Sequence, residues 1–285
     1  MNRTAAIRIL TTTLVIAGGY AAYTQNPAPR PLHTEKVKDN LYMISGDGGN
    51  VAVLVTNDGV ALVDDMYERN YADIMAQVKG ITEQPVRYVF NTHQHDDHAG
   101  SNAKMMSSAE VISHRNVRAN MVKLKQPGQP RVVFSSEMSV FLGGQEIRAQ
   151  YFGRGHTNGD AVIYFPALKV IHSGDLFLTN SATPLPFMDF AQGGSAVEWT
   201  STIDGMMSLD FDTVIPGHGP VSNRDGVLKW RADLVSMRGH IRDLVRQGKS
   251  KDEISDVLTG TYKWPKGGLA IAQVDAFIDE MKSWQ

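Results

Sequence analysis

The stretch NTHQHDDHAG, Asn91 to Gly100, holds three of the nine histidines of this chain together with two aspartates. These five side chains fall within six consecutive positions, His93 to His98. His93 and His95 alternate, so in an extended or turn segment both imidazoles face the same side. The pattern H-x-H-x-D-H arises by chance on the order of once in a thousand chains of this composition, or less often. The stretch therefore predicts a metal site, and a solvated polar loop is the weaker interpretation.

The bulk composition restricts how such a metal could be held and what the protein could bind. The chain has 285 residues, of which 42% are hydrophobic and 20% charged, as in a globular protein with a sizeable core. It contains no cysteine, so disulfides, thiolate zinc sites and a cysteine nucleophile are excluded. Any metal is therefore held by histidine and carboxylate alone. The formal net charge of −2, without a basic run, argues against a nucleic-acid partner and against a nuclease.

Residues 1–25 have the layout of a secretory signal peptide. Arg3 and Arg8 precede an apolar stretch from Ile9 to about Ala22, and small residues follow. The apolar run is short for a membrane span, although an uncleaved N-terminal anchor is the alternative. We expect a periplasmic or secreted protein with no stable membrane insertion once the signal has been cleaved.

Strand and helix patterns alternate from Leu41 onward. Residues 26–31, NPAPRP, read as an extended linker, and 32–285 as one domain. The alternation falls into two successive blocks, which favours layered α/β packing over an all-β sandwich. Predicted strands are 41–45, 51–56 and 59–64 as a meander, then 86–91, 109–114, a hairpin over 137–152 turning at Gly143–Gly144, 160–166, 168–175 and 211–219. Predicted helices are 70–80, with Gly80 as its C-terminal stop, 115–125, 195–209 and most of 225–284.

Three further candidate ligands each follow a predicted strand. They are His156 in GRGHTNGD, Asp175 in HSGD and His218 in PGHGP. Each is flanked by glycine, which lets backbone approach a site closely. Each alone is a weak signal, but together with the cluster they complete a ligand set for two ions.

At this point the sequence resembles the metallo-β-lactamase-fold hydrolases. THQHDDHAG is similar to their T-H-x-H-x-D-H-x-G signature, and GHT, GD and GHG at the three later positions match their further motifs in order. The resemblance covers about Val37 to Gly219. It implies an α/β fold, an αββα four-layer sandwich with the metals at one edge between two sheets, followed here by C-terminal helices.

The resemblance also implies roles for individual residues. The first metal would be held by His93, His95 and His156, and the second by Asp97, His98 and His218, with Asp175 bridging both. Asp96 is left as a spacer. An all-nitrogen-and-oxygen ligand set suits two zinc ions, with manganese and iron chemically admissible. Two such ions share a hydroxide that attacks a carbonyl carbon, and Asp97, as the catalytic residue, orients it or shuttles its proton.

We therefore expect an exported dinuclear zinc hydrolase acting on a carbonyl-centred bond of a small molecule. β-Lactam, lactone and thioester are the candidate substrates. Asp175 stands where several metallo-β-lactamases place Cys or Ser and resembles the bridging Asp of glyoxalase II and lactonases, whereas export is typical of antibiotic-degrading members. His95 replaces the Glu of the flavodiiron relatives and so favours hydrolysis. A mononuclear iron sulfur dioxygenase and a non-enzymatic periplasmic metal-binding protein are the alternatives.

A second set of residues lies outside the motifs. Of Asp64 and Asp65, which end a strand, we expect Asp64 to support the ligating histidines. His172 is interpreted as a structural strand residue. No role is assigned to the histidines without motif context, His33, His114 and His240.

The segment Leu178 to Ser195 reads as a long loop leaving the Asp175 site, and loops of this length are often functional. Its apolar residues Phe187, Met188 and Phe190 form either a wall for substrate or a satellite core. The charge alternation of the C-terminal helices predicts a solvated cover for the sheet.

Overall fold

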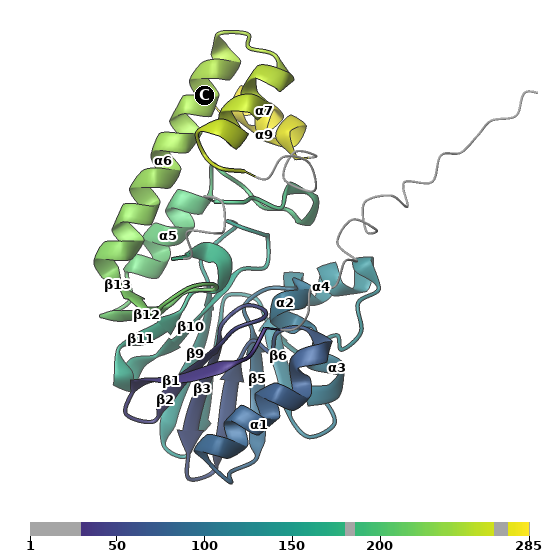
Figure 1. Cartoon of the computed structure of the whole chain (residues 1–285), viewed down its shortest axis with the longest axis vertical. Coiled ribbons are helices and arrows are strands. Elements are labelled where there is room, and N and C mark those ends of the chain that lie inside the picture. The colour runs from purple at the N-terminus through teal and green to yellow at the C-terminus, as the bar shows by residue number, and fades with distance from the viewer. Residues whose placement is uncertain (1–29, 180–185, 265–272, 285) are drawn as a thin grey trace, which may run out of the picture.

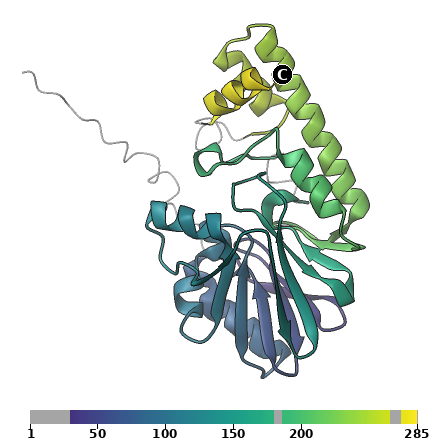
Figure 2. The same ribbon diagram turned by 180° about the vertical axis from the view of Figure 1, so that it is seen from behind.

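Two stacked β-sheets with helices on their outer faces make up the body of the molecule (Figures 1 and 2). The computed structural model describes residues 30–179, 186–264 and 273–284. The predicted signal peptide and most of the linker lie outside the described residues. The expectation of an αββα layered fold is confirmed.

The first sheet has seven strands in sequence order, with β2 to β4 as the predicted antiparallel meander and β4 to β7 parallel. Its edge strand β1, which pairs with β2, is not predicted from the sequence, because HTEKVK is mostly exposed and polar and has no apolar alternation. The strands are β1 His33–Lys38, β2 Leu41–Ser45, β3 Val51–Thr56, β4 Gly59–Val63, β5 Val86–Asn91, β6 Glu110–His114 and β7 Val132–Phe134.

The second sheet has six strands in the order β13-β12-β11-β10-β9-β8, and only β11 and β12 run parallel. The predicted hairpin β8–β9 turns at Gly143 and Gly144, whose φ angles of 54° and 77° lie in the left-handed region that glycine adopts without strain. The strands are β8 Glu137–Leu142, β9 Gln145–Tyr151, β10 Ala161–Phe165, β11 Val170–His172, β12 Thr213–Ile215 and β13 Ser222–Asn223.

The helices mostly match their predicted positions, with shifted boundaries: the helix predicted over 195–209 forms as α5 over Trp199–Met207. Gly80 does not end α1, which continues to Ile81; the N–H of Thr82 caps it by donating to the carbonyl of Val78, and Thr82 itself is already extended. The described helices are α1 Tyr71–Ile81, α2 Asp96–Ala99, α3 Asn102–Met105, α4 Arg115–Leu124, α5 Trp199–Met207, α6 Arg224–Arg246, α7 Lys251–Gly260 and α9 Val274–Ser283, with 3₁₀ turns at Glu68–Asn70, Pro166–Leu168, Gly174–Leu176 and Phe190–Gln192.

Strand alternation divides the apolar residues between separate cores. On β3, Ala52 and Leu54 face the second sheet, whereas Val51 and Val53 face α1 on the outer side. A third cluster joins the second sheet to α5 and α6 and includes Trp199. The order of layers is thus helix, sheet, sheet, helix.

The C-terminal helices are more than a solvated cover for the sheet. α6 packs beside α5 and then runs beyond the sandwich, where α7 and α9 pack against it (Figure 1). Leu234 and Ile241 of α6 and Phe277 of α9 are fully buried in the cluster around Trp199. Among the described residues, no helix combines the length and the apolar character needed to cross a bilayer.

The metal-motif segments meet at one end of the two sheets. The parallel strands β5, β11 and β12 all end there. β5 leads into the segment that carries His93, β11 into that of Asp175 and β12 into that of His218. His156 lies in the connection between β9 and β10. Segments that are far apart in the sequence therefore come together at this edge.

Candidate metal centre

The first candidate ligand group is formed by three imidazoles, those of His93, His95 and His156. Nδ1 of His95 lies 3.1 Å from Nε2 of His93 and 2.9 Å from Nε2 of His156. The three rings meet nearly edge to face, with interplanar angles of 81° to 88°. Three ring nitrogens thus converge on one point.

The second group combines carboxylate and imidazole. Nε2 of His218 lies 3.2 Å from Nε2 of His98 and 3.2 Å from Oδ2 of Asp97. Asp175 stands between the two groups: its Oδ1 is 3.2 Å from Nε2 of His98, and its Oδ2 is 3.6 Å from Nε2 of His156. The structure thus brings all seven predicted ligands together, with Asp175 in the bridging place.

Hydrogen bonds on the far side of each ring fix which nitrogen of the first group carries the proton. His156 donates from Nδ1 to the carbonyl of Phe187 at 2.7 Å, so its Nε2 presents a lone pair. His95 donates in the opposite sense, from Nε2 to Oδ2 of Asp189 at 3.0 Å, which leaves its Nδ1 free to coordinate.

Asp64 fixes two more rings. Its Oδ2 accepts hydrogen bonds from Nδ1 of His98 and from the hydroxyl of Thr92, both at 2.8 Å. The Thr92 oxygen in turn lies 3.1 Å from Nδ1 of His93, where it acts as acceptor because its proton is already given to Asp64. The expected contacts of Asp64 with candidate ligands are present, directly to His98 and through Thr92 to His93. Asp65 faces elsewhere and accepts from the N–H of Ser101 at 2.9 Å.

This arrangement fits a bound cation. Lone pairs of neutral imidazoles that face each other at about 3 Å repel unless a positive charge lies between them. Oδ1 of Asp175 is buried and forms no hydrogen bond of good geometry among the described residues, although Nε2 of His98 lies 3.2 Å from it, and buried polar atoms are rarely left in that state. Nitrogen and carboxylate donors without sulfur suit zinc, manganese or iron.

Two of the imidazoles are held in the neutral form, although Asp189 and Asp175 raise the pKa values of His95 and His98, respectively, against the effect of burial. Burial and the neighbouring imidazoles hold the pKa of His93 well below its usual range and lower that of His156 to about 4, so both are neutral donors near pH 7. Burial opposes ionisation of Asp175, but His218 and His98 outweigh it and hold the pKa of that carboxyl well below its usual range. Burial would also lower the pKa of His218, yet Asp175 and Asp97 raise it to about 9. Metal binding would displace the proton held there.

Two neighbouring residues take no part in the ligand groups, as expected. Asp96 is exposed, and its Oδ1 accepts from Nε2 of Gln126 at 2.7 Å, so it is a spacer. His172 is buried in β11, where its Nε2 donates to the carbonyl of Asn50 at 3.0 Å and its Nδ1 accepts from the N–H of Gly174. It is a structural residue.

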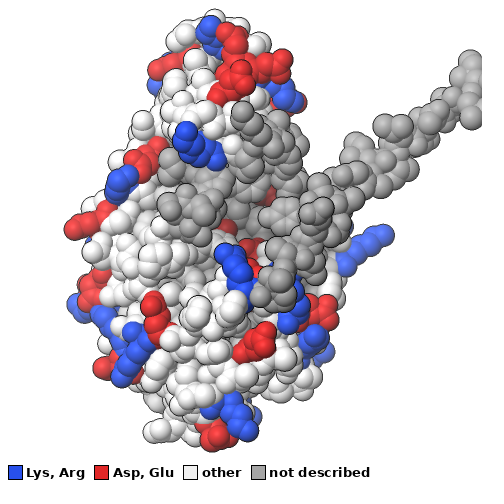
Figure 3. All heavy atoms as spheres, viewed as in Figure 1, with Lys and Arg blue, Asp and Glu red and all other residues white. Residues whose placement is uncertain are grey.

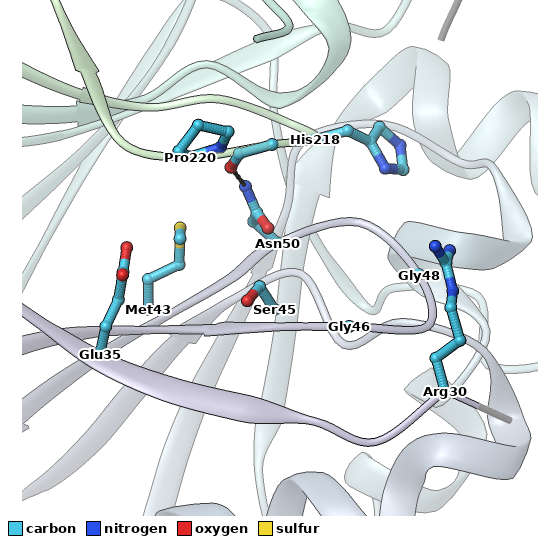
Figure 4. Close-up of a pocket in the computed structure, with 10 residues that line it drawn as sticks. Arg30, Glu35, Met43, Ser45, Gly46, Gly48, Asn50, His218 and Pro220 are labelled. Carbon is cyan, nitrogen blue, oxygen red and sulfur yellow. Dashed lines mark hydrogen bonds between the residues drawn. The ribbon is translucent and has the colours of Figure 1, made fainter. Parts of the chain in front are cut away.

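A cavity of about 320 Å³ opens beside His218 (Figure 4). Arg30 and Glu35 contribute opposite charges to its lining. Asn50 ties its two walls together, since its Nδ2 donates to the carbonyls of Pro216 at 2.9 Å and Gly219 at 2.8 Å. The cavity offers room for a small polar molecule next to the second ligand group.

The loop after Asp175 forms a satellite core rather than a separate wall. Met188 is fully buried, and Phe187 and Phe190 pack against the cluster that includes Trp264 and Phe277. Residues 180–185 of this loop lie outside the described residues.

Two site residues are not anticipated by the sequence. Asp189 binds His95, and Gln273, directly before α9, donates from Nε2 to Oδ1 of Asp189 at 3.1 Å. Neither residue stands in a motif, and only the folding of the chain brings them to the site.

The sequence model of the metallo-beta-lactamase superfamily matches residues 44–218, more than half of the chain. Metallo-beta-lactamase IND-1 of Chryseobacterium indologenes is 29% identical over 195 residues, covering 64% of this chain and 80% of the relative. A metallo-beta-lactamase type 2 of Elizabethkingia meningoseptica is 25% identical over 214 residues, covering 71% and 84%.

Solved structures agree on the fold. A metallo-beta-lactamase from Pontibacter korlensis matches with a TM-score of 0.65 at 20% identity, covering 71% of this chain and 98% of its own. The structure of metallo-beta-lactamase IND-7 gives 0.63 at 25% identity, covering 71% and 97%. The chain therefore belongs to the metallo-β-lactamase superfamily, and its fold and donor groups are those of a metal-binding hydrolase of that family.

Proposed function

We propose that the chain is an exported hydrolase that holds two zinc ions and cleaves a carbonyl-centred bond in a small molecule. The observation that carries the proposal is the place of Asp175, whose two oxygens face the two ligand groups from between them. His93, His95 and His156 would hold one ion, and Asp97, His98 and His218 the other. A carboxylate between two ligand groups can act as a bridge only when a cation is bound in each group.

When bound, the ions would supply Lewis-acid polarisation of the carbonyl and lower the pKa of water toward neutrality. The protein's own part is to place a carboxylate beside the reacting atoms. The side chains of Asp97 and His218 are 23% and 20% exposed while that of His98 is fully buried, so Asp97 is the carboxylate of its group that can reach solvent and substrate. Its ionised oxygen would orient the attacking water and accept its proton.

Two observations bear on the substrate. The curated relatives reported above are named metallo-beta-lactamases, which favours a β-lactam. Asp175 in the bridging place favours a lactone or thioester, as the resemblance to glyoxalase II and lactonases implies. Figure 3 shows Lys and Arg interspersed with Asp and Glu over the described part of one face, which suits a small molecule better than a polyanion.

The test compares two adjacent aspartates. Asp97→Asn should lower turnover by about 10²- to 10⁴-fold, whereas Asp96→Asn, which changes an exposed residue one position away, should keep wild-type activity. Purified protein is assayed for metal content and against a panel of β-lactams, lactones and thioesters.

Each outcome has a distinct meaning. Two zinc ions per chain and an Asp97-dependent activity support the proposal, and the active substrate names the class. One iron with oxygen consumption on a persulfide would replace it with a sulfur dioxygenase. Metal binding without turnover on any of the three bond types would leave a binding protein. Export is tested separately, by sequencing the N-terminus of protein recovered from the periplasm or the medium.

A further inference from the structure

Four hydrogen-bond donors converge on the buried carboxylate of Asp189. Oδ2 accepts from Nε2 of His95 at 3.0 Å and from the side chain of Gln192 at 2.7 Å. Oδ1 accepts from the backbone N–H of Gln192 and from Nε2 of Gln273, each at 3.1 Å. Only an ionised carboxylate satisfies four donors at once, because an amide would turn its own NH₂ toward two of them.

The contact to His95 decides which of its nitrogens can coordinate. A proton held on Nε2 by Asp189 leaves the lone pair on Nδ1, the atom that faces His93 and His156. The opposite tautomer would place a proton between the three rings. Among the seven candidate ligands the first group consists of imidazoles only, so Asp189 also supplies negative charge to it through His95, which raises the basicity of the ligand.

Asp189 is held in place from the C-terminal helices. Gln273 directly precedes α9, and its amide is fixed at both ends: Nε2 donates to Asp189, while Oε1 accepts from the N–H of Ala191 at 3.2 Å. Gln273 is itself buried. The orientation of its amide is therefore set by the backbone of the loop that carries Asp189.

A second contact fastens the same helix to the same loop. Glu280 of α9 accepts hydrogen bonds from the hydroxyl of Ser195 and from the N–H of Ala196, the latter at 2.9 Å. Both Gln273 and Glu280 lie after the residues 44–218 that match the family. The path from α9 to the candidate metal centre thus runs through residues outside the matched segment.

We propose that Asp189 is a positioning residue for His95 and that Gln273 fixes the orientation of the Asp189 carboxylate. α9 would thereby support metal binding at the first ligand group. The inference rests on the proposed function in so far as that function has metal bound there. α9 thereby acts on the centre without contributing a ligand to it.

The experiment measures stepwise Zn²⁺ affinities of the full chain by competition with a chromophoric chelator. The variants His95→Ala and His98→Ala identify which binding step belongs to which group. Asp189→Asn should weaken the first-group ion about 10- to 100-fold, the usual effect of losing a carboxylate behind a ligating histidine, and leave the other ion unchanged. Gln273→Met, which removes the donor to Asp189 and the acceptor for Ala191 and keeps the side-chain length, should weaken the binding of the same ion by a smaller factor.

Glu280→Gln is the matched control, because it alters the other contact of α9 with the loop and does not touch Asp189. It should leave both affinities at wild-type values even where it lowers the unfolding temperature. Wild-type affinities in both Asp189→Asn and Gln273→Met, or equal losses at both ions that follow the loss of stability, would overturn the inference. If Asp189→Asn does not fold, Gln273→Met decides. A wild-type chain that binds no Zn²⁺ would instead contradict the proposed function.

Discussion

Oδ2 of Asp64 accepts a hydrogen bond of 2.8 Å from Nδ1 of His98, and both side chains are fully buried. The bond joins the end of β4 to α2 and turns Nε2 of His98 toward His218. Asp64 has a φ of 63°, in the left-handed region that few residues other than Gly, Asn and Asp occupy readily. The backbone conformation of Asp64 and its carboxylate thus both serve to orient Nε2 of His98 toward the second ligand group.

Asp64→Asn should weaken zinc binding at the second ligand group about 10- to 100-fold. Asparagine tolerates the left-handed backbone, so the substitution tests the carboxylate alone. With its oxygen kept on the N–H of Thr92, the new amide would donate to Nδ1 of His98 and move the ring proton to Nε2, the atom that should coordinate. The measurement is the stepwise zinc affinity.

Asp65→Asn serves as the control for that prediction. Burial raises the pKa of Asp65 well above its usual range, and an asparagine there keeps an oxygen that accepts from the N–H of Ser101. Zinc affinity should therefore stay at the wild-type value. Two unaltered affinities in Asp64→Asn would show that Asp64 does not set the tautomer of His98.

Gly217→Ala should displace Asp175. A Cβ at position 217 would collide with Oδ1 of Asp175 and would lie 2.7 Å from the backbone carbon of Gly174. Backbone cannot yield as a flexible side chain does, so the carboxylate between the two groups must move. We expect weaker binding of both ions, measured by metal content after dialysis. Gly239→Ala, in α6, adds a methyl group that meets nothing within 4 Å and should leave metal content unchanged.

The layered fold and the motif residues could be predicted from sequence because each has a local signal. Val51 to Thr56 is rich in β-branched residues and is bounded by turn-forming residues. His93 to His98 is dense in side chains that can bind a metal. The edge strand His33–Lys38 gives no such signal, since most of it is exposed and it is held by pairing with β2 and by contacts of Thr34 and Lys38 to distant residues. A pattern of apolar residues predicts the strands that bury a face, and this mostly exposed strand has no such pattern.

Asp189 could not be predicted for a different reason. FMDFAQ, residues 187–192, is an ordinary loop sequence, and an aspartate in it is most simply a turn residue. Its meaning comes from two distant partners, His95 and Gln273, which lie 94 and 84 positions away along the chain. Contacts of that range are set by the packing of α9 on α6, for which the sequence pattern gives only a helix.

The free energy of unfolding should fall as the pH drops from about 6.5 to about 4, because His114 takes up a proton more readily in the unfolded chain. Burial lowers the pKa of His114 to about 4, aided by Arg115 and opposed by the hydrogen bond to the carbonyl of Ser135. The unfolded chain binds the proton near pH 6.5. Stabilisation is therefore complete above that pH and is lost by less than about 1.4 kcal/mol per pH unit below it. His114→Gln should remove this part of the slope in denaturant unfolding at several pH values; an unchanged slope would contradict the assignment.

Ser250 begins α7, and replacing it should weaken the C-terminal helices without altering the candidate metal centre. Its hydroxyl accepts from the N–H of Glu253, and the Glu253 carboxylate accepts from the N–H of Ser250 at 2.8 Å, which together form a capping box. Ser250→Ala removes the first of these bonds and should lower the free energy of unfolding by about 1 kcal/mol. Ser250→Thr retains a hydroxyl at the helix start and should recover most of that loss. α9 reaches Asp189 through Gln273 and not through α7, so the zinc affinity of both variants should equal that of the wild type. If the first-group affinity falls in Ser250→Ala, the helices support the centre through their overall stability and not through the Gln273 contact.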